Sequence, residues 1–189
     1  MTEEFWKKFA GFMVKISKIP FPISKNLIDF LQAKITEEQA KLLLEFKKHS
    51  MSFEQIKKKS ELTADELGAM LNELMDNGII AGFPDEKTGS LKYTLMALFP
   101  GIIEYAFAGG KTGAHEENLA HLVENMIGDL REVFLNNYDI IMPQLKSFPA
   151  FERIIPVEES IPVGQQVVLT TENAFKIVDE TDDLAIVHC

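Results

Sequence analysis

Apolar residues recur at helical spacing over much of the chain, and this pattern predicts several amphipathic helices. Residues 3–18 predict the first, with Phe and Met side chains on one side and lysines on the other. Pro20 and Pro22 end it, and residues 23–34 predict a second helix. Residues 115–137 predict a long helix whose apolar stripe consists of Leu119, Leu122, Met126, Ile127, Leu130, Val133 and Phe134.

The middle of the chain contains three capping boxes, in which a Thr or Ser precedes a Gln or Glu by three positions. They predict helices over 37–49, 53–59 and 64–77, and Asn77-Gly78 stops the last of these. Residues 79–83, a turn-rich stretch, and residues 90–95 then predict strand, turn and strand. Three helices followed by a hairpin predict a winged helix-turn-helix within a mainly α (α+β) chain.

The winged helix and the regions that flank it divide the chain into four predicted segments. They are an N-terminal helical extension (1–35), the winged helix (36–96), a helical segment (97–142) with a buried helix over 99–108, and a Pro-containing segment (143–189). The last is expected to be irregular or β, with strands near 152–157 and 166–170, a short helix near 172–180 and an apolar end.

Charge changes this picture. The net charge is −10, yet residues 1–60 carry +5 and residues 61–189 carry −15. The acidic part repels nucleic acid and anionic membranes, so only the first third could attract them. The single cysteine and the absence of a secretory signal or a long apolar run predict a cytoplasmic protein, with no stable membrane insertion.

A DNA-binding function is the obvious alternative for a helix-turn-helix. The predicted recognition helix, residues 64–77, contains acidic residues but neither Lys nor Arg, although phosphate neutralisation dominates DNA affinity. The candidate DNA contacts are the basic residues around it: Lys57, Lys58, Lys59, Lys87 and Lys92. The three consecutive lysines also suit a helix C-terminus, where they complement the dipole. We therefore expect packing or protein contact, with DNA binding as the alternative.

Other chemistry is weakly indicated. Helix 3–18 could lie on an anionic membrane with Trp6 at the interface, but its apolar side is expected to dock on the protein. Glu117, His121 and Glu124 share one side of the long helix at a spacing that could bind a metal, but this side lies opposite the apolar stripe and is expected to be solvated. The loop at 109–112 lacks the spacing of a phosphate-binding motif, and no nucleophile–base set is implied, so no enzyme is predicted.

Several stretches, in the same order along the chain, resemble the N-terminal region of bacterial and archaeal ferredoxin-like iron–sulfur proteins. Residues 35–43 (ITEEQAKLL) resemble that family's opening helix. Residues 91–104 resemble its wing strand and following P-G-[IV]-x-E turn, and residues 151–157 (FERIIPV) its R-[IV]-I-P-V segment. Residues 172–189 resemble the approach to its C-x-C-R motif, with Cys189 as the first cysteine.

The resemblance implies a winged-helix region that precedes a part binding [4Fe-4S] clusters. A cluster needs about four thiolates, and this chain has one. We therefore expect no cofactor in this chain, which would be a fragment of a longer electron-transfer protein, with Cys189 as a candidate cluster ligand only there. Its expected partner is a redox protein or its own iron–sulfur domain, and the long helix is compatible with a homodimer.

Overall fold

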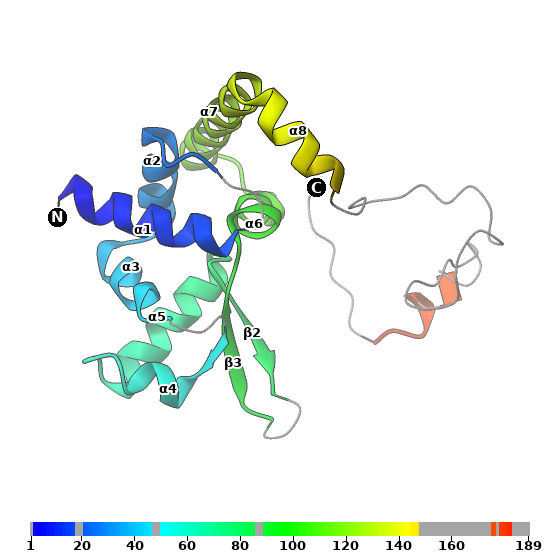
Figure 1. Ribbon diagram of the computed structural model, residues 1–189. Helices are drawn as coiled ribbons and strands as arrows, with labels where there is room; N and C mark the ends of the chain where they lie inside the picture. Colours follow the sequence, from blue (N-terminus) through cyan, green and yellow to red (C-terminus); the bar gives the residue numbers. More distant parts are fainter. Residues whose placement is uncertain are drawn as a thin grey trace. The chain divides into compact units, whose positions relative to one another are not determined.

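The structure of the protein, a computed structural model, describes residues 2–17, 21–46, 50–85, 89–147, 175–176 and 178–182. It divides into two compact units, with the boundary between Asn136 and Asn137. The N-terminal unit consists mainly of helices and includes a small antiparallel sheet (Figure 1). The predicted mainly α (α+β) class is confirmed at this level.

Helix α1 (Glu3–Ile16) docks on the protein through its apolar side. Phe9 and Met13 are fully buried, and the helix contacts helices α2 (Lys25–Lys34) and α3 (Glu37–Leu44). Trp6 is 8% exposed and meets Phe9 edge-to-face, with ring centroids 5.9 Å apart. Trp6 therefore belongs to the core, which contradicts the alternative in which it lies at a membrane interface.

The three capping boxes begin α3, α4 (Phe53–Lys57) and α5 (Ala64–Asp76), as predicted. Each cap side chain accepts a hydrogen bond from the backbone amide three positions later, and that residue's side chain accepts one in return. A cap of this kind is worth about 1 kcal/mol. The predicted helices 37–49 and 53–59 were too long, since α3 ends at Leu44 and α4 at Lys57.

Gly78 ends α5 in the left-handed region, with φ at +67°. The amide of Gly78 donates to the carbonyl of Met75 and the amide of Ile79 donates to that of Leu74, both at 2.9 Å. These two bonds form a Schellman motif, which satisfies carbonyls that the helix end leaves without a partner. The ring of Tyr105 lies directly over this glycine.

The sheet has the strand order β1-β3-β2 and is antiparallel throughout. Strands β2 (Ile80–Pro84) and β3 (Leu91–Leu95) form the predicted hairpin, which extends away from the helices in Figure 1. Strand β1 (Ser50–Ser52), which the sequence did not predict, pairs with β3 so that Met51 lies opposite Tyr93. The sheet thus links the start of α4 to the hairpin.

The prediction of one helix over residues 99–108 is confirmed for residues 103–108 and wrong for residues 99–101, whose backbone is not helical. Helix α6 spans only Ile103–Ala108, and Ile103 is its buried residue, whereas Tyr105 is half exposed. Pro100 disfavours helical geometry at Phe99, which is extended with φ −149° and ψ 133°. The segment before α6 is held by Ser17, whose Oγ accepts a hydrogen bond of 2.8 Å from the amide of Leu98.

Helix α7 (Ala114–Asn136) is the predicted long helix, and it packs beside α2 (Figure 1). Leu119 and Met126 are buried, but Ile127 and Val133 of the predicted stripe are exposed. Helix α8 (Tyr138–Ser147) belongs to the second unit and continues through Pro143, so the prediction of irregular or β structure was wrong for residues 143–147. Residues 175–176 and 178–179 are helical, in agreement with a helix near 172–180, and the other predicted C-terminal elements lie outside the described residues.

Candidate functional site

The outer face of α5 is the first candidate site, because this helix corresponds to the predicted recognition helix, for which protein contact was expected and DNA binding was the alternative. Its exposed side includes Asp65, Glu66, Glu73 and Asp76, and the helix contains no basic residue. Hydrogen bonds from the backbone and hydroxyl of Thr63 hold the pKa of Glu66 below its ordinary value. Glu66 therefore stays ionised at neutral pH, and the face presents negative charge to any ligand.

The lysines at the end of α4 lie close to this face but differ in their contacts. The Nζ atom of Lys59 donates a hydrogen bond of 3.0 Å to the carbonyl oxygen of Glu45, the residue that follows α3. Lys57 is half buried and helps to lower the pKa of Glu66. Lys58 is exposed. One of the three lysines is therefore engaged in closing the end of another helix.

The hairpin contributes one described lysine. Lys92 of β3 forms an ion pair with Asp85, and the amide of Asp85 donates a hydrogen bond of 2.8 Å to the carbonyl of Ser90 across the turn. Lys92 is thus neutralised by a carboxylate of its own hairpin. The remaining candidates, Lys87 and Cys189, lie outside the described residues.

No protein-family model, curated protein or solved structure matches this chain. The functional argument therefore depends on the chemistry of its own surfaces.

Behind the acidic face, a polar link that the sequence analysis missed joins α3 to α5. Gln39 is 2% exposed, accepts a hydrogen bond of 2.9 Å from the amide of Thr36 and donates one of 2.8 Å to a carboxylate oxygen of Glu73. One side chain therefore completes a capping box and also joins α3 to α5 by a hydrogen bond. The capping-box pattern identified Gln39, but no local pattern could identify Glu73 as its second partner.

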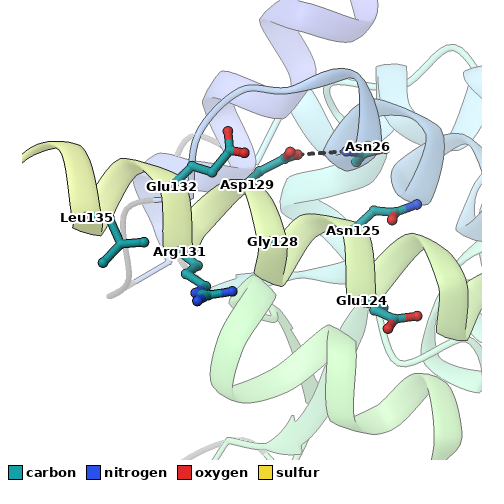
Figure 2. A pocket seen from close by; sticks show the side chains of 8 residues that line it. All are labelled: Asn26, Glu124, Asn125, Gly128, Asp129, Arg131, Glu132 and Leu135. Carbon is teal, nitrogen blue, oxygen red and sulfur yellow. Dashed lines mark hydrogen bonds between the residues drawn. The ribbon is translucent and has the colours of Figure 1, made fainter.

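A hollow of about 490 Å³ lies where α7 meets α2 and is the next candidate site. Figure 2 shows Asn26 of α2 bonded to Asp129 of α7, with the Nδ2 and Oδ2 atoms 2.9 Å apart. Glu124 and Glu132 point in opposite directions in the same view. The polar groups around this hollow do not converge on one point, so their arrangement gives no reaction centre.

Glu117, His121 and Glu124 of α7 are all exposed, in agreement with the prediction that this side of the helix is solvated. The side chains of His121 and Glu124 are 68% and 81% exposed, and His121 Nδ1 lies 3.7 Å from Glu124 Oε2. Across the part of the chain that the structure describes, no three His, Cys, Asp or Glu side chains are grouped so as to hold a metal ion. Within the same residues, no helix is both long enough and apolar enough to cross a membrane.

The glycine-rich loop at residues 109–113 connects α6 to α7. A phosphate-binding loop of the Walker type follows a strand instead. Burial, followed by repulsion from Lys111 of this loop, lowers the pKa of Lys34 at the end of α2. The loop therefore places two lysines within electrostatic reach of each other, without the backbone geometry of a phosphate cradle.

Proposed function

We propose that residues 36–96 form a winged helix-turn-helix that acts as a non-catalytic docking module for protein partners. The arrangement that supports this proposal is α3, α4 and α5, followed by the β2–β3 hairpin, with β1 added to the sheet between α3 and α4. In this proposal α5 takes the position of a recognition helix and the hairpin that of the wing.

The acidic outer face of α5 is the observation that favours a protein partner over DNA. Duplex DNA bears a phosphate charge about every 1.7 Å along its axis, and binding requires Lys or Arg to replace its counterions. The α5 face offers four carboxylates instead, although one of them, Glu73, also accepts a hydrogen bond from Gln39. Lys59 and Lys92, which could have compensated, already bond to groups of this chain. A protein partner with basic or neutral groups meets no such repulsion.

We further propose that the module positions the electron-transfer part of an iron–sulfur protein. This second step depends on the sequence resemblance, and on Cys189 as a candidate first ligand of a [4Fe-4S] cluster in a longer polypeptide. The other thiolates would have to come from outside these residues, because one cysteine cannot ligate a cluster that needs about four. Such a protein would pass single electrons between cellular donors and acceptors.

A titration of fluorescein-labelled mixed-sequence duplex DNA, followed by anisotropy, tests the docking proposal. At about 0.15 M salt we expect only non-specific affinity, with a Kd of about 10⁻⁴ M or weaker. Tight, salt-sensitive binding that is lost in Lys57→Glu or Lys58→Glu would support a DNA-binding regulator and refute the proposal. Lys25→Glu is the matched control, because Lys25 is also an exposed helical lysine but lies on α2.

The iron–sulfur proposal has a separate test. The natural polypeptide containing these residues should be purified without oxygen and analysed for iron, acid-labile sulfide and a broad brown absorbance. We expect all three, with less iron in Cys189→Ser than in Glu180→Ser, a control change in the same region. A natural polypeptide free of iron and sulfide would end this proposal and leave the docking proposal intact.

A further inference from the structure

A groove between α1 and α3 combines an apolar floor with a basic rim. It has a volume of about 750 Å³. The floor consists of Gly11 and Phe12 of α1, Leu44 of α3, and Ile23 from the segment just before α2. Ile23 is 51% exposed, whereas Phe12 and Leu44 are half buried. The floor thus presents apolar surface that is partly open to solvent, and this surface suits apolar side chains that project from a partner.

Lysines surround this floor. Lys7 and Lys41 each bond to a carboxylate one helical turn earlier, at 2.6 and 3.1 Å. Lys8 and Lys15 are exposed, and none of the described residues forms an ion pair with either. The two lie seven positions apart, which places them on one side of α1 about 10 Å from each other. Glu45 is the acidic residue at the rim.

We propose that this groove binds an acidic amphipathic helix of a partner protein. Such a helix would insert apolar side chains spaced by three or four residues between α1 and α3. Its flanking carboxylates would meet Lys8 and Lys15, whose separation matches one heptad of the partner helix. The positive rim of the groove is complementary to the carboxylates of such a helix. It stands out because the chain as a whole carries a net charge of −10.

Two other anionic surfaces fit less well. A bilayer would need protruding apolar side chains, but Trp6, Phe9 and Met13 of α1 are buried in the core. Duplex DNA would bring its phosphates close to a chain whose residues 61–189 carry −15. A short acidic helix carries far fewer charges than a duplex, so it meets less of this repulsion, and its apolar side can lie in the groove.

The inference extends the proposed docking role to a different surface from α5, so the two can fail separately. The probe is a fluorescein-labelled helical peptide of about 15 residues, with Leu at helical spacing flanked by Glu. At about 0.15 M salt we expect a Kd in the micromolar range, typical of a small interface. A permuted peptide of the same composition, without the Leu stripe, should bind at least about tenfold more weakly.

Variants locate the binding site. Lys8→Glu/Lys15→Glu should weaken binding at least about tenfold, and Lys58→Glu on α4 should change it less than about twofold. Gly11→Leu should also weaken binding. A β-carbon added at Gly11 would lie 3.4 Å from Cδ1 of Ile23, so the larger leucine side chain would fill the floor of the groove. The lysine variants change exposed side chains, so they remain informative if Gly11→Leu misfolds.

Three results would overturn the inference. Equal binding of the permuted peptide would show that the floor is unused, and equal losses in the α1 and α4 variants would show non-specific attraction. Sedimentation with phosphatidylserine vesicles that needs Lys8 and Lys15, without peptide binding, would identify a membrane surface instead.

Discussion

Replacing Gly78 by alanine tests the junction between α5, the hairpin and α6. A non-glycine residue in the left-handed region costs about 1–2 kcal/mol. The added β-carbon would also lie 2.0 Å from Cδ1 and 2.7 Å from Cβ of Tyr105. Overlap that reaches the root of a side chain cannot be relieved by moving its tip, and overpacking of this kind costs about 1–3 kcal/mol. We expect Gly78→Ala to lower the free energy of unfolding by about 2–5 kcal/mol.

A double-mutant cycle separates the two costs. Tyr105 is 50% exposed, and Tyr105→Gly removes both the ring and the Cβ atom that the new β-carbon would overlap, at a helix-propensity cost of about 1 kcal/mol. In that background Gly78→Ala should cost only the conformational part, about 1–2 kcal/mol, which leaves a coupling energy of about 1–3 kcal/mol. Urea unfolding followed by far-ultraviolet circular dichroism measures all four proteins. Equal costs in both backgrounds would refute the packing of Tyr105 on Gly78, and no cost in either would refute the left-handed geometry.

Two further predictions concern α1 and the α5 cap. Phe9→Ala should destabilise the protein by about 3–5 kcal/mol in the same urea assay, because the ring is fully buried. The control Lys8→Ala, on the exposed side of α1, should cost less than about 0.5 kcal/mol. Equal losses of stability in the two variants would mean that α1 is not docked on the protein. Because the folded-state pKa of Glu66 is lowered, its contribution to stability is present above its ordinary pKa and is lost as pH falls through the folded value. A carboxyl titration by NMR should show the pKa of Glu66 rising partly toward normal in Thr63→Val, which retains the backbone bond, and an unchanged pKa would contradict the cap.

The starts of α3, α4 and α5 could be predicted because their determinants are local. A cap side chain and the amide three positions later are neighbours in any helix that begins there, so Thr36, Ser52 and Thr63 mark those starts without knowledge of the fold. The stop at Gly78 is equally local. Strand β1 has no such signal, because Ser50–Ser52 become a strand only by pairing with residues about forty positions later in β3.

The periodicity of α7 identified its apolar side but could not show which residues of that side are buried. Leu119 and Met126 are buried, whereas Ile127 is 51% exposed. A similar distinction applies to the candidate site. The negative charge of α5 is a property of its residues, so it could be predicted. The bonds of Lys59 to Glu45 and of Lys92 to Asp85 depend on tertiary contacts and could not.

These contacts change how the basic first third of the chain should behave toward anions. Within residues 1–60, Lys59 has a partner within the chain, whereas Lys8 and Lys15 have no ion-pair partner among the described residues. At about 0.01 M salt the screening length of about 30 Å would let every lysine attract a polyanion, and weak DNA binding there would not identify a site. At about 0.15 M the length falls to about 8 Å, and only charges beside the ligand count. Anion binding that persists at the higher salt should therefore depend on the α1–α3 groove and remain unchanged by substitutions at the end of α4.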